Sequence, residues 1–229
     1  MITSGGVEFG SDCPPEEYRT IDPMSLLRRW LPPADAAPAL MALSTLGRDG
    51  YPRVRHVLLS DADDTAVYFH TDSRSSKVAE LTELPRAGIA VAWPQSGRQV
   101  VADGTVRRPS EESLRESFSR RTRYLQLLAW CNDHEMSALS PDERHRRWAE
   151  FDAAHPVLGP PDTWTGFAID IREITFWRGD PDGPSQRIRF ARNDTSWTSE
   201  ALPRMTGTTF HNALILPVSG DRPWFRGGG

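Results

Sequence analysis

The sequence predicts a mainly β protein with helical additions, an α+β fold in which antiparallel strands form a β-barrel. Two observations lead to this prediction. Short apolar segments separated by turn signals follow one another along the chain, which is typical of an antiparallel meander. Segments with capping residues and proline breakers interrupt these strands and indicate inserted helices. With 229 residues, 38% of them hydrophobic, the chain is long enough to bury a substantial core.

The first half of the chain is predicted to contain two short helices and a strand meander. The first helix begins at Asp22 and Pro23, because aspartate caps free amides and proline suits the first helical position. It ends at residues 32–33, two prolines that cannot continue a helix. Residues 47–50, of sequence GRDG, are a hairpin turn signal between the first two strands. The other predicted elements of this half are strands at Ala39–Leu46, Pro52–Ser60, Ala66–Thr71, Ala87–Trp93 and Arg98–Arg108, an acidic turn at Asp61–Asp64, and a helix from Ser75 or Ser76 to Leu84.

The second half is predicted to form two capped helices followed by further strands. Ser110, with two glutamates after it, begins a helix that runs to about Arg120. Ser140, with a proline and two acids after it, begins a helix that ends near Ala154. A proline cluster at residues 156–161 breaks the chain before it returns to strands. These strands are expected at Gly166–Ile171, Ile174–Trp177, Gln186–Ala191 and Trp197–Ala201.

We expect one folded domain over residues 22–203, with a tail at each end. Residues 1–21 are predicted to be a flexible N-terminal segment, because the first dozen are rich in glycine and serine. Residues 204–229 form a C-terminal extension that is polar and rich in glycine and proline. This extension is expected to be flexible, although its segment Ala213–Val218 is apolar enough to pack against the domain.

The composition excludes several classes of protein. With 27 Lys+Arg against 31 Asp+Glu, the net charge of −4 argues against a dedicated nucleic-acid binder. No apolar run approaches the ~20 residues that span a bilayer, and the N-terminus does not resemble a secretory signal. Cys13 and Cys131 are too few for a disulfide framework or a zinc cluster. We therefore expect a cytoplasmic protein that binds no membrane, no nucleic acid and no metal.

Cations on a strand and before a helix are the clearest chemical signal in the sequence. Arg53 and Arg55 lie in an apolar strand, where they either face solvent or hold an anion such as phosphate. The segment Thr71–Lys77 brings hydroxyls and cations to the start of a helix, whose free amides bind phosphate. The same serines are also consistent with a plain helix cap. Phosphate-loop, dinucleotide, zinc-protease and nucleophile-elbow motifs are absent from the sequence.

Five short motifs occur in order along the chain: Arg55-His56-Val57-Leu58-Leu59, Phe69-His70-Thr71, Ser75-Ser76-Lys77, Gly97-Arg98-Gln99-Val100, and Phe176-Trp177 with Arg187. In this order and spacing they resemble the pyridoxine/pyridoxamine 5'-phosphate oxidases, and the first helix also resembles that of phenazine-biosynthesis flavin oxidases. The resemblance covers about residues 22–203. It implies an FMN-binding split β-barrel that forms a homodimer, with FMN in a cleft between the subunits.

The resemblance also implies which residues bind FMN. Arg55 and Lys77 match basic ligands of the family, while Trp177 and Gln99 match further contacts. Without the resemblance, Trp177 would be an ordinary core aromatic and Gln99 a surface strand residue. The complete implied set of cofactor ligands is Arg55, His56, Val57, Leu58, His70, Thr71, Ser75, Ser76, Lys77, Gln99, Trp177 and Arg187.

The substrate positions depart from the family more than the cofactor positions do. Arg121 is retained, and it is the best candidate for substrate contact, with His70 and Trp177 as pocket walls. Ser60 stands where the family has a lysine. The second basic residue before the FMN-binding lysine is replaced by Ser76, and a Gln-Ser pair aligns loosely with His134-Glu135. Further substrate positions are replaced at Ser117, Leu125, Gly183 and Ser185.

These departures lead to three functional hypotheses. The first is an FMN-dependent oxidase that transfers hydride from a small cyclic or aromatic substrate to FMN, with oxygen as acceptor. The second is a genuine pyridoxine/pyridoxamine 5'-phosphate oxidase with a rebuilt substrate site. The third is a protein that binds flavin or deazaflavin without oxidase turnover. No residue in the sequence is assigned as a general acid or base.

Overall fold

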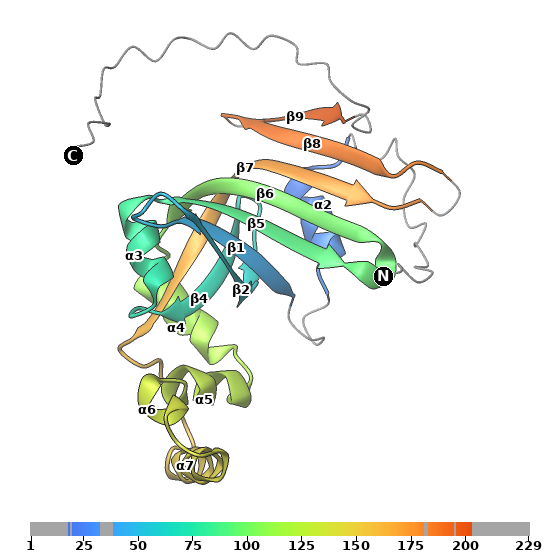
Figure 1. Ribbon diagram of the computed structural model, residues 1–229. Helices are drawn as coiled ribbons and strands as arrows, with labels where there is room; N and C mark the ends of the chain where they lie inside the picture. The colour runs from blue at the N-terminus through green and yellow to red at the C-terminus, as the bar shows by residue number, and fades with distance from the viewer. Residues whose placement is uncertain (1–17, 19, 33–38, 181–182, 195, 203–229) are drawn as a thin grey trace, which may run out of the picture.

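A nine-stranded antiparallel sheet curls into a half-barrel and forms the body of the protein (Figure 1). The computed structural model describes residues 18, 20–32, 39–180, 183–194 and 196–202. The strands follow the order β2-β1-β5-β6-β7-β4-β3, and β8 and β9 extend the sheet from β7. Their bounds are β1 Leu40–Leu46, β2 Pro52–Leu58, β3 Asp61–Ala62, β4 Ala66–Asp72, β5 Arg86–Trp93, β6 Arg98–Arg107, β7 Trp164–Arg178, β8 Gln186–Asn193 and β9 Ser196–Ala201.

The helices begin where capping residues predict them to begin. Asp22 accepts a hydrogen bond from the amide of Ser25 at 2.8 Å, with Pro23 in the first turn. Ser110 and Ser140 cap two later helices in the same way. Two helices that the sequence analysis did not predict, α5 and α6, lie between those two. The bounds are α2 Pro23–Trp30, α3 Ser76–Glu83, α4 Glu111–Ser119, α5 Arg123–Cys131, α6 His134–Ser137 and α7 Pro141–Ala154, with a short 3₁₀ turn η1 at Pro94–Ser96.

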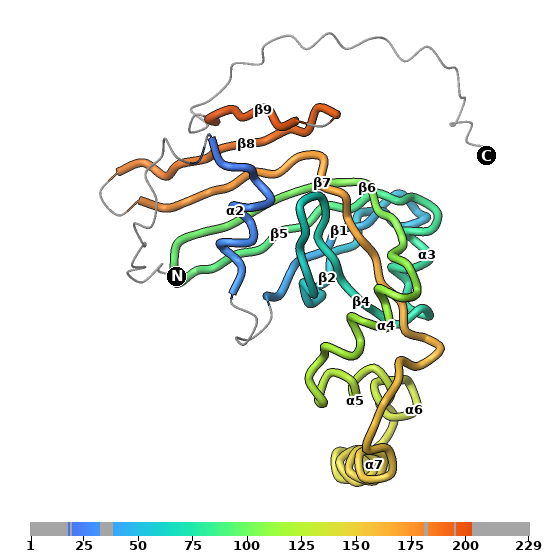
Figure 2. The backbone as a smooth tube through the Cα atoms, turned by 180° about the vertical axis from the view of Figure 1, so that it is seen from behind, coloured from blue at the N-terminus to red at the C-terminus, as the bar shows by residue number. Residues whose placement is uncertain are grey.

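Helix α2 closes the core on one side of the sheet. Seen from behind, it crosses in front of the strands (Figure 2). Trp30 on this helix is buried and packs edge-on against Phe176 of β7, with ring centroids 5.1 Å apart. Tyr18 and Trp93 also pack edge-on against Trp30. The buried apolar face of α2 therefore fixes the inner face of the sheet, on which β1, β5, β6 and β7 place their core residues.

Strand β7 corrects the prediction of two separate strands at Gly166–Ile171 and Ile174–Trp177. It is one continuous strand with an irregularity at Arg172. Glu173 is paired with Asp103 and Ile171 with Gly104, so Arg172 has no opposing residue on β6. A Cβ atom at Gly104 would lie 2.1 Å from the carbonyl oxygen of Asp170, so only glycine lets β7 pass this close. The acidic turn predicted at Asp61–Asp64 likewise contains the short strand β3.

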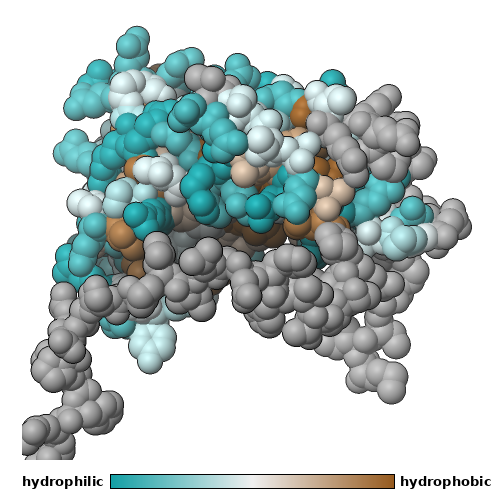
Figure 3. Space-filling view, turned by 90° about the horizontal axis from the view of Figure 1, so that it is seen from above, coloured by the Kyte–Doolittle hydropathy of each residue, from teal (hydrophilic) through white to brown (hydrophobic). Residues whose placement is uncertain are grey.

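The helices α5, α6 and α7 project away from the sheet (Figures 1 and 2). Arg123 joins the first and last of them, because its guanidinium contacts the Asp152 carboxylate at 2.6 Å. Viewed from above, the described surface is mostly hydrophilic, with small hydrophobic areas between the polar side chains (Figure 3). The flexible segments predicted at the two ends concern residues that lie outside the described part, except for residues 18, 20 and 21.

Candidate cofactor and substrate site

Strands β2 and β4 and the start of α3 bring together two cations and two hydroxyls predicted to bind a cofactor. Lys77 donates to the Thr71 hydroxyl at 3.0 Å and to the Ser75 hydroxyl. Burial lowers the pKa of Lys77 below its usual value, and the nearby guanidinium of Arg55 lowers it further. The chain folds this way because β4 ends only a short turn before α3 begins. We call Arg55, Thr71, Ser75 and Lys77 the cationic cradle.

The structure gives Arg53 and Arg55 different surroundings. Arg53 pairs with Asp49 at 2.5 Å on the surface of the hairpin. Arg55 is partly buried and contacts Glu80 of α3 at 2.7 Å and the hydroxyl of Thr45. Neither Thr45 nor Glu80 was predicted from the sequence. Glu80 lies three residues after Lys77 in a predicted helix, and this spacing was a usable signal that both share one face.

The cradle fits the phosphate of the FMN that the resemblance implies. Ser75 begins α3 but makes no side-chain cap hydrogen bond, whereas the N-cap side chains of α2, α4, α5, α6 and α7 all do. Its hydroxyl contacts Lys77 instead, so a side chain does not cap the first amides of α3. Open amides at a helix N-terminus, an ammonium and a guanidinium are donors that suit a phosphate dianion.

A second cluster surrounds His70, and we call Ser60, His70, Arg121 and Trp164 the histidine pocket. Ser60 Oγ lies 2.9 Å from His70 Nδ1. The imidazole stacks on Trp164, with ring centroids 4.9 Å apart and planes 4° apart. The guanidinium carbon of Arg121 lies 4.6 Å from the centroid of the Trp164 ring. Burial lowers the pKa of His70 to about 4, and the charges of Arg121 and Arg120 contribute, so the imidazole is neutral at pH 7.

Arg121 is the cation that this pocket offers to a ligand. Its neighbours Arg120 and Arg123 pair with Asp61 at 3.7 Å and Asp152 at 2.6 Å. Arg121 is half-buried, its pKa is lowered by burial, and it forms no ion pair with any carboxylate in the described part of the chain. A desolvated guanidinium without a counter-charge favours an anion. Trp164 was not predicted from the sequence, because it follows a proline cluster and carries no local signal.

Gln99, Trp177 and Arg187 form a row across β6, β7 and β8. Gln99 pairs with Trp177, and Trp177 pairs with Arg187. Directly paired residues of antiparallel strands point to the same face. Phe176 is 4% exposed and takes the core position, so Trp177 lies on the outer face and is not a core aromatic. Arg55 lies on the opposite, inner face, in register with buried residues of β1, β5 and β6. Within one chain, the row of Gln99, Trp177 and Arg187 is therefore separated from the cradle by the sheet.

The other predicted site residues are spread over the surface and the core. On β2, Val57 is buried in the core while His56 is exposed and Leu58 is partly buried. Ser76 is exposed in the first turn of α3. The remaining replaced positions are Ser117 and Leu125, both partly buried, and the exposed residues His134, Glu135, Gly183 and Ser185.

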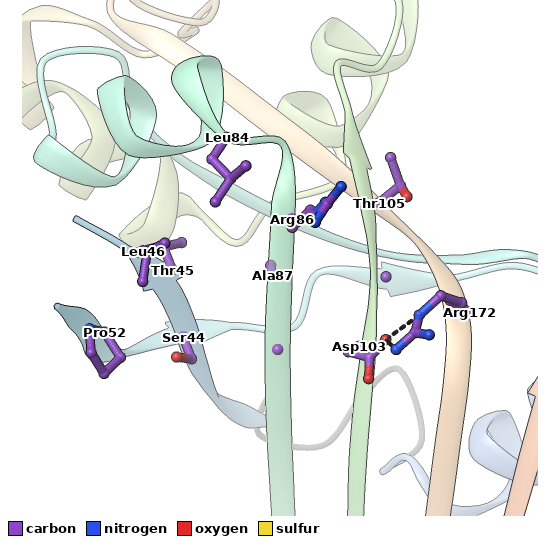
Figure 4. Close-up of a pocket in the computed structure, with 12 residues that line it drawn as sticks. Ser44, Thr45, Leu46, Pro52, Leu84, Arg86, Ala87, Asp103, Thr105 and Arg172 are labelled. Atoms are coloured by element: carbon purple, nitrogen blue, oxygen red, sulfur yellow. Dashed lines mark hydrogen bonds and ion pairs between the residues drawn. The ribbon is translucent and has the colours of Figure 1, made fainter. Parts of the chain in front are cut away.

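A groove of about 660 Å³ lies on the outer face of the sheet (Figure 4). It runs from Thr45 and Leu84, beside the cradle, to Arg172 of β7. Arg172 and Asp103 form an ion pair at 2.8 Å along one side (Figure 4). In the part of the chain that the structure describes, no helix has the length and apolarity to cross a membrane. No cluster of three or more metal-binding side chains occurs among those residues either.

The buried neutral His70 is expected to make the folded protein sensitive to acid. Its pKa of about 4 lies below the ordinary 6.5, so between these values the unfolded chain binds a proton that the folded chain does not. The stabilisation is complete above pH 6.5 and decreases toward pH 4, with about 2 kcal/mol lost by pH ~5. Denaturant unfolding of the wild type and of His70→Gln at pH values near 4 and above 6.5 measures this change in the free energy of unfolding.

In His70→Gln, the free energy of unfolding should no longer show the part of the pH dependence that His70 causes. His145→Gln, at an exposed position of α7, serves as the control and should keep the acid sensitivity of wild-type unfolding. Identical pH dependence in the wild type and in His70→Gln would contradict a buried neutral imidazole at this position.

Comparisons with known proteins agree with this architecture. The family model for pyridoxamine 5'-phosphate oxidase matches residues 34–155, and the model for the C-terminal dimerisation region of pyridoxine 5'-phosphate oxidase matches residues 164–203. A pyridoxine/pyridoxamine 5'-phosphate oxidase of Acidothermus cellulolyticus is 34% identical over 214 residues, which cover 88% of this chain and 91% of that protein. One from Salinibacter ruber is 34% identical over 199 residues, covering 81% of this chain and 91% of that protein.

Solved structures lead to the same group of proteins. PhzG from Burkholderia lata, in complex with tetrahydrophenazine-1-carboxylic acid, superposes with a TM-score of 0.72 at 26% identity, covering 85% of this chain and 98% of that chain. A pyridoxamine 5'-phosphate oxidase-related, FMN binding protein from Nostoc punctiforme shares the fold, with a TM-score of 0.51 at 21% identity, covering 85% of this chain and all of the other.

The curled half-barrel and these matches define the class of this protein, a flavoprotein of the FMN-binding split-barrel type. The chain belongs to the pyridoxamine 5'-phosphate oxidase family, and it is an enzyme with FMN as cofactor. The fold class, the family and the cofactor predicted from the sequence are therefore confirmed.

Proposed function

We propose that this enzyme oxidises a small, reduced cyclic or aromatic compound by hydride transfer to FMN, with oxygen as the electron acceptor. The observation that carries the proposal is the contrast between two clusters. The cradle retains its cations and hydroxyls, while the histidine pocket has Ser60 beside a neutral His70. A pocket with few cations suits a substrate that carries less charge than a phosphate dianion.

In this proposal each cluster has a separate task. The cradle binds the FMN phosphate through Arg55 and Lys77, and FMN supplies the hydride acceptor when bound. Arg121 holds one acidic group of the substrate, and Trp164 provides a flat apolar wall beside it. A carboxylate on a cyclic ring matches this arrangement. The PhzG structure, which contains tetrahydrophenazine-1-carboxylic acid and covers most of this chain, supports the choice.

The second candidate is a true pyridoxine/pyridoxamine 5'-phosphate oxidase with a rebuilt substrate site. The names of the relatives at 34% identity favour it. One experiment tests both candidate functions. Purified protein is loaded with FMN and mixed anaerobically with a panel of reduced cyclic carboxylates and with pyridoxamine 5'-phosphate. Bleaching of the flavin band by a cyclic carboxylate supports our proposal. Bleaching by pyridoxamine 5'-phosphate alone supports the alternative, and no bleaching by any donor contradicts both.

We place this activity in the cytoplasm, as the cysteine content predicts.

We further propose that the enzyme is a homodimer in which each FMN contacts both subunits. Within one chain, the row of Gln99, Trp177 and Arg187 lies on the opposite face of the sheet from Arg55. In a symmetric dimer, the row on the outer face of one copy would face the cradle of the other copy and complete its site. The match of residues 164–203 to a dimerisation region supports this arrangement. So do exposed apolar residues on the same outer face, Val54 at 68% and Val101 at 52% exposed.

The proposed interface makes a prediction about mass in solution. Light scattering is expected to give about twice the chain mass of 25.7 kDa. Val101→Glu places a charge in the apolar face, so we expect it to yield monomers with weakened FMN binding. Val157→Glu, at a position that is 87% exposed outside the sheet, should remain dimeric. A wild-type monomer with FMN bound would contradict the shared site.

A further inference from the structure

The Arg55 side chain is held by two residues to which the proposed function gives no task. The Thr45 hydroxyl donates to Glu80 Oε2 at 2.5 Å and accepts from Arg55 Nη1, and Arg55 Nη2 donates to the same Glu80 oxygen at 2.7 Å. Thr45 is 4% exposed, and the side chains of Arg55 and Glu80 are 21% and 11% exposed. These three side chains form a closed ring of hydrogen bonds, which we call the arginine clamp.

The clamp occupies one edge of the guanidinium and leaves the other available. Nη1 donates to Thr45 and to the carbonyl of Arg53 at 3.1 Å, so both of its hydrogens are used. Nη2 uses one hydrogen for Glu80, and Nε meets no acceptor within the described residues. Nε and the second Nη2 hydrogen lie along one planar edge, which matches two oxygens of a phosphate.

We propose that Thr45 and Glu80 are positioning residues that hold Arg55 with its Nε–Nη2 edge presented to the FMN phosphate. The proposal rests on the role given above to Arg55 as a phosphate ligand. An arginine has many rotamers, and one that is fixed beforehand loses less conformational entropy when it binds. The clamp therefore increases affinity for the phosphate without touching it.

Glu80 has an opposing electrostatic effect that the test must separate. Burial alone would raise the pKa of its carboxyl, but hydrogen bonds from Thr45 and Arg55 hold this pKa below its usual value, so Glu80 is ionised. Its charge repels the phosphate, whereas its hydrogen bond orders Arg55. At about 0.5 M salt the Debye length is ~4 Å, so the repulsion is screened more than the direct hydrogen bond. Measurements at high salt therefore report the positioning effect.

The experiment titrates flavin-free protein with FMN and with riboflavin, which lacks the phosphate, at about 0.5 M salt. Thr45→Val and Glu80→Ala are each expected to raise the Kd for FMN about tenfold and to leave the Kd for riboflavin unchanged. The double variant should lose about as much as either single variant, because both residues act on one guanidinium. Glu80→Gln keeps an oxygen acceptor for Nη2 and should lose less than Glu80→Ala.

Two further variants make the outcomes decisive. Glu83→Ala is the matched control on α3, because Glu83 pairs with an exposed Arg48 at 2.7 Å, and both Kd values should stay unchanged. If Arg55→Ala keeps the preference for FMN over riboflavin, the role of Arg55 itself is wrong. If Arg55→Ala removes that preference while Thr45→Val and Glu80→Ala keep it, the positioning role is overturned. An equal loss of FMN and riboflavin affinity in Thr45→Val would also overturn it.

Discussion

Pyridoxamine 5'-phosphate is expected to reduce the bound flavin at least a hundredfold less efficiently than a reduced cyclic carboxylate. Ser60 stands where the resemblance implies a lysine, and Ser117, Leu125 and Gly183 replace further substrate positions. Losing two charge-assisted contacts costs ~3–6 kcal/mol, which is more than a hundredfold in affinity. The neighbouring His70 does not restore the missing charge, because its pKa of about 4 leaves it neutral at pH 7.

Anaerobic stopped-flow reduction of the FMN-loaded protein measures this difference directly. Ser60→Lys returns one cation to the pocket and should improve reduction by pyridoxamine 5'-phosphate about tenfold or more. Ser60→Ala also removes the contact with His70 but adds no charge, so it is the matched control and should bring no gain. Rapid bleaching of the wild-type flavin by micromolar pyridoxamine 5'-phosphate would contradict this prediction and support a true pyridoxine/pyridoxamine 5'-phosphate oxidase.

Lys77→Ala is expected to raise the Kd for FMN roughly ten- to hundredfold. The substitution removes a half-buried ammonium from the cradle, and a charge-assisted hydrogen bond contributes ~1.5–3 kcal/mol. Riboflavin has no phosphate, so its affinity should change little. Quenching of flavin fluorescence during titration measures both constants. The loss should also be smaller at high salt, because screening weakens the electrostatic part of the binding energy.

Arg74 provides the control for this prediction. It lies in the same turn as Lys77 but is exposed and paired with Asp72 at 2.6 Å. Arg74→Ala should therefore leave the Kd for FMN unchanged. Equal losses of FMN and riboflavin in Lys77→Ala would contradict a phosphate contact at Lys77. If the protein binds deazaflavin but not FMN, the assignment of FMN as the cofactor is contradicted.

The elements that the sequence predicted well depend on local signals. Asp22 with Pro23, Ser110 and Ser140 mark helix starts, because a cap acts within three or four residues of itself. The hairpin of residues 47–50 is local in the same sense, and Gly50 has the positive φ of 80° that its turn requires. Helices α5 and α6 were not predicted from the sequence.

The continuity of β7 shows the limit of local signals. Its register with β6 shifts at Arg172, and Gly104 of β6 comes close to Asp170 only in the folded sheet. A reading of residues 164–178 alone contains no trace of that contact. Strand register is a property of two segments, so it is set by tertiary pairing.

The candidate site divides in the same way. The sequence by itself determined the family, the cofactor and the cradle segment Thr71–Lys77, because these depend on residue types in a fixed order. Tertiary structure decided that Arg55 meets Glu80 and Thr45 and that His70 lies neutral against Trp164. These partners are distant in the sequence, and hydrogen bonding and desolvation arise only when folding removes water between them.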